Sequence, residues 1–318
     1  MRRYPTLFKE FPHTRYASLP CFKLTDTAMF LDQQEQNVYE THELECIERL
    51  CKVLMMVKSR DGLPLKYVYP LKWDLGLPFE FHKTLVEKYP EHLRVVKTKN
   101  GVLSLRLEQW RDELAVSALQ KRYESAEFKR GREALSFPMN FPKGYGREKK
   151  VQSWMDCFQK LPYISPYEDS SKIDPNSDLM EKRVVAVLHE LLSLTIHKKT
   201  KRNYLTCLID ELNLPDKFTR VFTRYPGIFY LSMKCKTTTI TLKEAYERGK
   251  LVDPHPLSRV RDKFYYVMRA GIMYRGKKVD FIPDKDFLVN YKENGSEQEE
   301  SEEEEEVDME MWSESDDE

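Results

Sequence analysis

The sequence lacks the features that mark membrane-spanning proteins, disulfide-rich secreted domains and the common nucleotide-dependent enzymes. No run approaches the ~20 consecutive apolar residues of a membrane-spanning helix, which predicts no membrane partner. The six cysteines have no Cys-x-x-Cys spacing and no neighbouring pair of histidines, which argues against a disulfide framework and against a zinc site. There is also no Walker loop, no Gly-x-Gly-x-x-Gly and no Gly-x-Ser-x-Gly motif.

Two partial matches to functional motifs are incomplete. His189-Glu190 begins like the His-Glu-x-x-His helix of zinc proteases, but Ser193 occupies the position of the second histidine. Gly144-Tyr145-Gly146 lacks the Lys-Ser/Thr continuation of a phosphate-binding loop. We therefore expect His189 to pack between structural modules, and we predict no catalytic residues, metal, cofactor or small-molecule substrate. A catalytic dyad of residues distant in the sequence is the alternative that motif analysis leaves open.

Basic residues are absent from the C-terminal 26 residues, and this absence conceals the charge of the rest. The whole chain balances 52 Lys and Arg against 52 Asp and Glu. Fifteen of the acidic residues lie in 293–318, so residues 1–292 carry a net charge of +15. A basic body predicts a polyanionic partner, and the acidic tail is expected to be solvated and disordered. The tail either competes with the polyanionic partner for the basic surface or keeps a basic protein soluble.

An internal repeat is marked by three Tyr-Pro dipeptides, each of which follows a basic residue. They are Arg3-Tyr4-Pro5, Lys88-Tyr89-Pro90 and Arg224-Tyr225-Pro226. Leu77-Pro78 and Leu214-Pro215 precede the second and third dipeptides at nearly the same distance. These agreements, found in the same order, indicate copies of one structural unit.

Each copy of the repeat predicts three helices followed by a β-hairpin. Apolar residues at helical spacing predict a first helix around 44–57 and around 184–192, followed by a second near 65–75 and 204–212. A third helix is expected to begin at Pro78 or Pro215 and to end before the Tyr-Pro proline. Asn100-Gly101 predicts a hairpin with a type I′ turn, and residues 229–242 predict a hairpin with a longer tip. The predicted fold class is α+β, mostly helical, with tandem winged-helix-like modules.

These patterns divide the chain into six segments. Residues 1–40 are expected to be a truncated first module that holds a wing and the following helix, because Met1 falls at the end of a predicted third helix. That position suggests a truncated, fragmentary or divergent start, with two further helices and a presequence encoded upstream. The other segments are a second module at 41–124, a Pro/Gly/aromatic connector at 125–177, a third module at 178–250, a basic C-terminal extension at 251–292 and the acidic disordered tail at 293–318.

Clusters of cations in the third module and the connector are the candidate RNA contacts. Lys217, Arg220 and Arg224 fall on one face of the predicted third helix, opposite an apolar face. The other candidates are Lys198, Lys199, Lys201 and Arg202 between the first two helices, and Lys143, Arg147, Lys149 and Lys150 in the connector. Converging cations of this kind suit a nucleic-acid backbone. Ordinary solvated helix surface is the alternative for each of them.

The C-terminal extension mixes cations with aromatic residues, a combination that suits single-stranded RNA. Its cations are Arg259, Arg261, Lys263, Arg269, Arg275, Lys277 and Lys278. Phe264 lies among them and is expected to belong to a core instead. The tyrosines of the Tyr-Pro dipeptides are likewise expected to be packing residues, because they recur at a fixed structural point.

Five motifs between residues 19 and 232 resemble the plant organelle RNA recognition family. They are Leu-Pro-Cys-Phe-Lys-Leu-Thr (19–25), Leu-Lys-Trp-Asp-Leu-Gly-Leu-Pro (71–78), Leu-Pro-Tyr-Ile-Ser-Pro-Tyr (161–167), His-Glu-Leu-Leu-Ser-Leu-Thr (189–195) and Tyr-Pro-Gly-Ile-Phe-Tyr-Leu-Ser (225–232). The similarity as a whole runs from about Arg3 to Arg269. The resemblance implies a protein that promotes the splicing of group II introns in mitochondria or chloroplasts. The chain departs from the family at its N-terminus, where members carry a transit peptide and a complete first repeat.

Together these patterns predict a non-enzymatic RNA-binding protein. Its expected partners are organellar intron RNA and, within a ribonucleoprotein complex, other splicing factors. The resemblance favours the mitochondrion over the chloroplast. The alternative is a protein–protein adaptor in an organellar splicing complex that makes no direct RNA contact.

Overall fold

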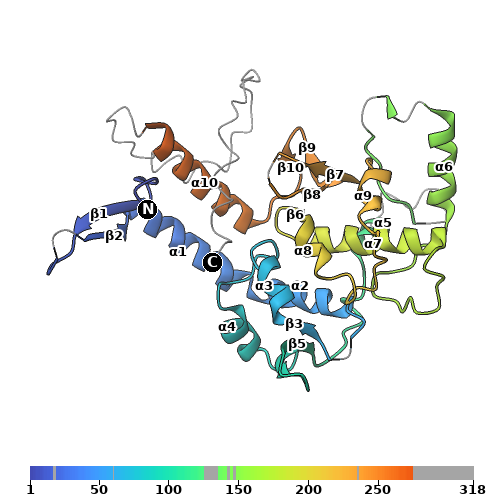
Figure 1. The fold of residues 1–318 in the computed structure, drawn as a ribbon, viewed down its shortest axis with the longest axis horizontal. Helices are drawn as coiled ribbons and strands as arrows, with labels where there is room; N and C mark the ends of the chain where they lie inside the picture. Colours follow the sequence, from blue (N-terminus) through green and yellow to red (C-terminus); the bar gives the residue numbers. More distant parts are fainter. Residues whose placement is uncertain are drawn as a thin grey trace. The chain divides into compact units, whose positions relative to one another are not determined.

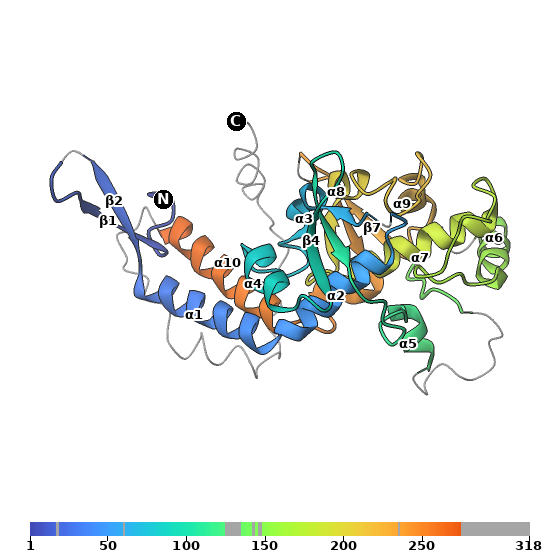
Figure 2. The same cartoon turned by 90° about the horizontal axis from the view of Figure 1, so that it is seen from below.

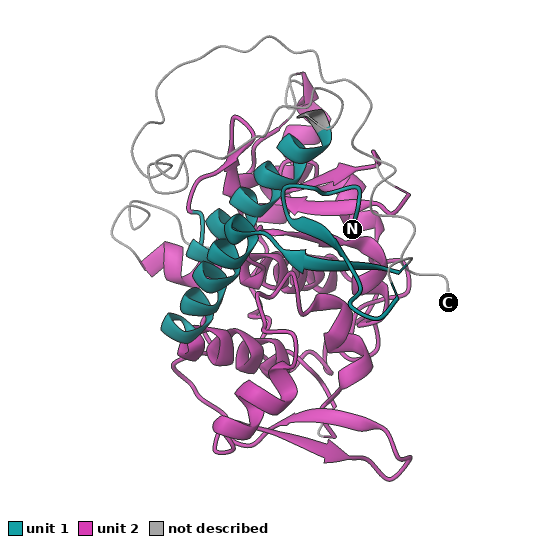
Figure 3. Cartoon of the chain, turned by 90° about the vertical axis from the view of Figure 1, so that its left-hand side faces the viewer, with its two compact units in different colours: residues 1–42, 254–308 teal, residues 43–253, 309–318 magenta. Residues whose placement is uncertain are grey.

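The computed structural model describes residues 1–16, 19–59, 61–124, 135–141, 144–145, 148–234 and 236–274. The acidic tail and part of the basic C-terminal extension lie outside these residues. The described chain forms two compact units (Figure 3). Unit 1 holds residues 1–42 and 254–274, and unit 2 holds residues 43–253. None of the described helices combines the length and the apolar character needed to cross a membrane.

Unit 1 consists of a β-hairpin and two long helices that pack against each other (Figure 2). Its elements are β1 (Phe8–Pro12), β2 (Pro20–Leu24), α1 (Asp26–Thr41) and α10 (Pro256–Tyr274). The helix α1 begins at Asp26 because the side chain of Thr25 accepts a hydrogen bond from the Ala28 N–H at 3.2 Å. Leu31 and Val267 form the centre of the contact between α1 and α10, and Phe264 packs against them as the sequence predicted.

Unit 2 contains two segments with the same order of elements, which we name repeat A (residues 43–107) and repeat B (residues 178–247). Repeat A holds α2 (Glu43–Met55), β3 (Leu63–Pro64), α3 (Leu65–Leu71), α4 (Phe81–Lys88), β4 (Leu93–Lys97) and β5 (Leu103–Leu107). Repeat B holds α7 (Asp178–Leu194), β6 (Lys199–Lys201), α8 (Arg202–Thr206), α9 (Arg220–Arg224), β7 (Phe229–Ser232), β8 (Thr239–Leu242), η2 (Lys243–Ala245) and β9 (Tyr246–Glu247). Their three-stranded sheets have equivalent orders, β3-β5-β4 and β6-β8-β7. Figure 1 labels all three strands of the second sheet.

Both predicted hairpins are confirmed, but the tip of the first differs from the expectation. In the β4–β5 pair, Val95 lies opposite Leu105. A type I′ turn needs positive φ at two residues, whereas only Gly101 has it here, at +78°. The Gly101 N–H donates to Thr98 O at 2.9 Å, and the Thr98 N–H donates to Val102 O at 2.8 Å. The tip is therefore a longer loop in which a tight turn precedes a glycine in the left-handed region.

The two repeats pack through reciprocal contacts into one core. When the Leu-Pro pairs are aligned, Asp74 corresponds to Glu211. The Lys58 N–H donates to Glu211 O at 2.8 Å, and the Ile196 N–H donates to Asp74 O at 2.7 Å. The same surface is thus used by both repeats, as in a two-fold symmetric dimer. The apolar faces of α2 and α7 supply much of the shared core.

Two helices lie between the repeats, α5 (Ala118–Glu124) before the predicted connector and α6 (Lys149–Lys160) within it. After repeat B, β10 (Lys250–Leu251) pairs with β9. The sequence analysis did not predict α6, although the signal is present. Val151, Trp154, Met155 and Phe158 recur at helical spacing, and all four contribute to the core of unit 2.

Candidate nucleic-acid interface

Lys217 and Arg220 lie at the surface of repeat B, beside a buried apolar face. Phe218, Val221 and Phe222 fill the core beneath them and fix the orientation of this segment. Both cations are exposed, and within the described part of the chain neither forms an ion pair. Lys217 precedes α9, which begins at Arg220 rather than at Pro215. The helix is shorter than predicted because residues from Pro215 onward form tight turns, such as the bond from Phe218 N–H to Pro215 O.

Arg224 is held by the protein itself. Its guanidinium donates to Glu181 at 2.7 Å and lies 4.9 Å from the ring centroid of Trp154. The neighbouring Tyr225 hydroxyl donates to the other oxygen of Glu181, also at 2.7 Å. Burial raises the pKa of Tyr225, and the hydrogen bond to Glu181 adds to this effect. Arg224 therefore ties the end of α9 to the first turn of α7.

Repeat A contains the same tie. Glu43, in the first turn of α2, accepts from Lys88 Nζ at 2.5 Å and from the Tyr89 hydroxyl at 3.1 Å. In each repeat, the basic residue and the tyrosine of the Tyr-Pro motif thus donate hydrogen bonds to a glutamate in the first turn of the first helix. This contact supplies a structural reason for the motif to recur, and the predicted packing role of Tyr225 is confirmed by its 2% exposure.

The basic stretch before α8 divides into outward and inward side chains. Lys199 and Arg202 are exposed, and Lys201 lies 5.4 Å from the ring centroid of Tyr204. Lys198 is half-buried, its Nζ donates to Ser193 O at 2.6 Å, and burial lowers its pKa. Between the outward lysines, Thr200 is buried because β6 alternates.

The remaining predicted cations have mixed positions. Lys149 and Lys150 are exposed at the start of α6, whereas Lys143 and Arg147 lie outside the described residues. In the C-terminal extension, Arg261 is buried and pairs with Glu35 at 3.5 Å. Arg275, Lys277 and Lys278 are also outside the described residues.

His189 is buried in a polar contact within unit 2. Its Nε2 lies 2.9 Å from Glu244, which also accepts from Arg122 at 2.6 Å. Burial alone would raise the pKa of Glu244, but the hydrogen bond to His189 and the charge of Arg122 lower it. The His189 ring packs 5.4 Å from that of Phe137, so its packing partners include the connector.

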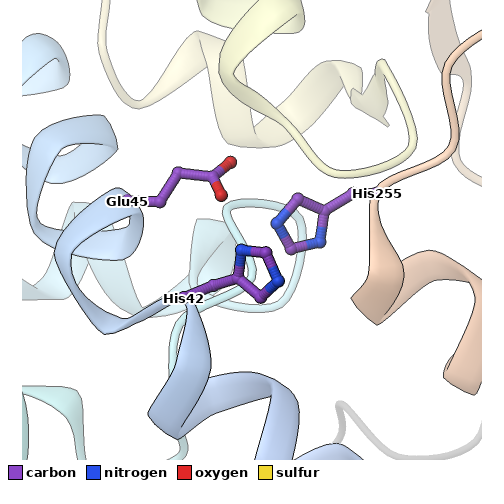
Figure 4. Close-up of side chains that lie close together, drawn as sticks. All are labelled: His42, Glu45 and His255. Carbon is purple, nitrogen blue, oxygen red and sulfur yellow. The ribbon is translucent and has the colours of Figure 1, made fainter.

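A pair of imidazoles lies within unit 1. His42 follows α1 and His255 precedes α10, with ring centroids 5.2 Å apart (Figure 4). His255 Nδ1 also accepts from the Leu257 N–H at 3.0 Å, which organises the first turn of α10. The ring contact joins neighbouring ends of the two long helices of this unit.

Repeat A also presents a group of exposed aromatic residues that the sequence patterns did not predict. Tyr69, Trp73 and Phe79 are 36%, 53% and 78% exposed. Trp73 lies within the 71–78 motif beside Lys72, and Phe79 directly follows the motif. The sequence signal for this group is Trp73 beside Lys72. It was overlooked because the predicted helix at 65–75 already accounted for the apolar residues of this segment.

Comparison with known proteins places these features in a family. Residues 1–273 match the Plant organelle RNA recognition domain. The chain is 37% identical to Protein WHAT'S THIS FACTOR 9, mitochondrial, of Arabidopsis thaliana, over 92% of this chain and 77% of that protein. It is 34% identical to Protein WHAT'S THIS FACTOR 1 homolog, chloroplastic, of Arabidopsis thaliana, over 99% of this chain and 60% of that protein.

A third relative comes from Zea mays. The chain is 33% identical to its Protein WHAT'S THIS FACTOR 1, chloroplastic, over 83% of this chain and 54% of that protein. The chain thus spans less than two thirds of the length of these two chloroplastic relatives. No solved structure matches the chain. The match over residues 1–273 shows that the chain belongs to the plant organelle RNA recognition family.

Proposed function

We propose that this chain binds organellar intron RNA directly and promotes the splicing of group II introns without catalysing it. The observation that carries the proposal is the pair Lys217 and Arg220, which are exposed and form no ion pair among the described residues. A cation without a carboxylate partner can neutralise a phosphate without first giving up an internal contact. Lys199 and Arg202 extend the basic surface in the same repeat.

The arrangement of each repeat supports a winged-helix-like reading of repeats A and B. In such folds a helix and a nearby corner contact the phosphate backbone on one side. Here the intron RNA performs the transesterification, and the protein holds it in a splicing-competent fold. Other splicing factors join it in a ribonucleoprotein complex.

The proposed location is a plant organelle. The relatives named above are mitochondrial or chloroplastic, and the 37% identity to the mitochondrial protein favours the mitochondrion. Immunoprecipitation of the tagged chain from isolated mitochondria, followed by sequencing of the bound RNA, tests this assignment. Enrichment of group II intron sequence is expected, whereas enrichment of no intron would overturn it.

A salt titration tests direct RNA contact. The variant Lys217→Ala/Arg220→Ala is compared with Lys160→Ala/Lys172→Ala, which removes the same charge from two other exposed positions. Two lost phosphate contacts are expected to reduce the slope of log affinity against log salt by about 1.4–1.8. Arg224 is left intact because its loss would also break the tie to Glu181.

The control defines the outcomes. Equal effects of both double variants would show that only net charge matters, which contradicts a specific surface. A wild-type chain whose RNA affinity is absent or independent of salt would instead support the adaptor alternative.

A further inference from the structure

An aromatic and cationic cluster covers the surface between α3 and α4 in repeat A. Lys72 Nζ lies 3.8 Å from the ring centroid of Phe79 and 5.8 Å from that of Tyr69. The Tyr69 hydroxyl is 3.1 Å from His82 Nδ1, and the two ring centroids are 5.7 Å apart. Trp73 follows Lys72 directly and is 53% exposed. We name Tyr69, Lys72, Trp73, Phe79 and His82 the aromatic platform.

Repeat B shows that the fold does not need these rings. Both repeats have a residue of positive φ before the Leu-Pro pair, Gly76 at +68° and Asn213 at +52°. The bonds Leu77 N–H to Lys72 O and Leu214 N–H to Ile209 O also match, at 2.8 and 2.9 Å. This alignment fixes which residues correspond. The counterparts of Tyr69, Trp73 and Phe79 in repeat B are Thr206, Asp210 and Asp216.

The buried positions, in contrast, are retained. Phe81 of repeat A and Phe218 of repeat B are both 0–1% exposed, and each donates its N–H to the proline of the Leu-Pro pair. The repeats therefore keep the core residue and differ at the neighbouring surface positions. Three large rings at the surface of one repeat alone serve something other than folding, because exposing apolar area to water is unfavourable.

The charge around the aromatic platform favours an anionic ligand. Lys66 and Lys72 form no ion pair among the described residues. The nearby carboxylate of Asp74 accepts a hydrogen bond from Thr200 Oγ1 at 2.5 Å instead. This hydrogen bond also places the residue after Trp73 against β6, between Lys199 and Lys201. The helices α3 and α8 lie side by side in both views (Figures 1 and 2). The aromatic platform and the basic stretch 199–202 are thus neighbours.

We propose that the aromatic platform stacks the bases of single-stranded RNA while the adjoining lysines contact its phosphates. This inference rests on the proposed function and adds a second site with a different chemistry. Stacking on rings is available to every unpaired base and needs no particular sequence. Bases inside an A-form duplex are already stacked and do not reach such rings, so unpaired intron segments are the ligand class.

The test separates base stacking from phosphate attraction. The probes are an oligouridylate of about 15 nucleotides, within the site size of a single-strand binding module, and an abasic oligonucleotide of equal length. The variant is Trp73→Ala/Phe79→Ala. Its affinity for oligouridylate is expected to fall about tenfold or more, whereas its affinity for the abasic chain and its salt slope stay unchanged. The variant Lys217→Ala/Arg220→Ala is expected to bind both probes more weakly than the wild type.

Two controls keep the result interpretable. Trp73→Phe/Phe79→Tyr retains two rings and is expected to keep wild-type affinity. Because both side chains are more than half exposed, the alanine variant is expected to keep the wild-type melting temperature.

The failures of the two proposals are distinguishable. If the wild-type chain binds neither probe, direct RNA binding fails and the platform fails with it. If the wild-type chain binds both probes and the alanine variant binds them equally well, the stacking inference is overturned while RNA binding stands. The platform would then belong to a protein partner.

Discussion

At the scale of single residues, the stability of unit 2 depends on a charge buried between its two repeats. Glu190 of α7 is fully buried and pairs with Lys52 Nζ at 2.8 Å. It also accepts from the Tyr167 hydroxyl and from the Ala118 N–H, both at 2.6 Å. Both oxygens of the carboxylate are thus used. Removing it leaves the buried Lys52 ammonium without its counter-charge, and the Tyr167 hydroxyl and the Ala118 N–H lose their acceptor.

Glu190→Ala is therefore expected to lower the free energy of unfolding by about 3–5 kcal/mol. Urea denaturation followed by circular dichroism measures it. Glu87→Ala, which removes an exposed carboxylate of α4, provides the control and is expected to change stability by less than about 0.5 kcal/mol. Equal effects of the two substitutions would contradict the role given to the buried pair.

Lys182 is a second buried charge, but its partners are carbonyl groups. Its Nζ donates to Leu161 O at 2.5 Å, to Gln159 O at 2.9 Å and to Leu135 O at 3.3 Å. Burial lowers the pKa of this ammonium to about 8. In the unfolded chain the pKa returns to lysine's ordinary value of 10.5. Between these two values the unfolded state binds more protons than the folded state, so stability rises with pH.

The difference in unfolding free energy between the wild type and Lys182→Met is thus expected to grow in favour of the wild type from pH 8 to pH 10. Below pH 8 both states hold the proton and the difference is flat. Denaturation curves at pH 7, 8, 9 and 10 give the comparison, in which other titrating groups cancel. A difference that stays constant over this range would rule out a depressed Lys182 pKa.

Residue-scale prediction from the sequence succeeded where neighbours along the chain decide the outcome. Helical spacing predicted that Lys217 and Arg220 would lie opposite buried Phe218 and Val221, and the structure has them so. It could not show that Arg224 is held by a glutamate 43 positions away, because no local pattern encodes that contact. The aromatic platform was not predicted for a related reason, because tertiary packing decides whether an aromatic ring is exposed.

At the scale of elements, Gly62 and Gly101, two of the three glycines of repeat A with positive φ, differ in the space around them. Gly101 lies at the open tip of the β4–β5 hairpin, at φ +78°, where an added Cβ meets only Lys97 Cε at 3.8 Å. Gly62 precedes β3 at φ +85°, and a Cβ there would overlap the carbonyl oxygen of Leu105 in the paired strand β5. At Gly101 only the positive φ disfavours a side chain. At Gly62 a side chain would also collide with the backbone of β5.

Gly101→Ala is consequently expected to cost about 1–2 kcal/mol, the strain of the left-handed region. Gly62→Ala is expected to cost about 4 kcal/mol or more, because β3 must move away from β5. Melting temperatures of the two variants, measured side by side, test the order. A Gly62→Ala protein as stable as Gly101→Ala would show that β3 is free to shift.

The ends of elements were harder to predict than their existence. The sequence predicted a helix from Pro215 to Tyr225, yet α9 spans only Arg220–Arg224. The proline fixes its own φ but does not commit the following residues to helical hydrogen bonds, and the chain forms successive tight turns before α9 begins. Likewise the sequence identified the hairpin at Asn100-Gly101 but misassigned its turn type.

At the scale of the whole chain, repeats A and B of unit 2 share one hydrophobic core. The ion pair Lys52–Glu190 joins equivalent positions of α2 and α7. Lys52 lies nine residues after Glu43, and Glu190 lies nine residues after Glu181, the two glutamates that the Tyr-Pro motifs bind. Reciprocal contacts allow the surfaces of the repeats to diverge while the core is kept. Repeat B carries the exposed cations and repeat A the aromatic platform on which the two proposals rest, so one scaffold presents two different chemistries.

The body and the tail of the chain carry opposite charges. Residues 1–292 carry +15, and residues 293–318 carry fifteen acidic groups. If the tail competes with RNA for the basic surface, deleting 293–318 raises nonspecific RNA affinity at low salt. The gain is expected to vanish near 1 M salt, where the Debye length falls to about 3 Å. A tail with each Glu and Asp replaced by Gln or Asn keeps its length and is expected to match the deletion. Unchanged affinity in both variants at low salt would leave solubility as the role of the tail.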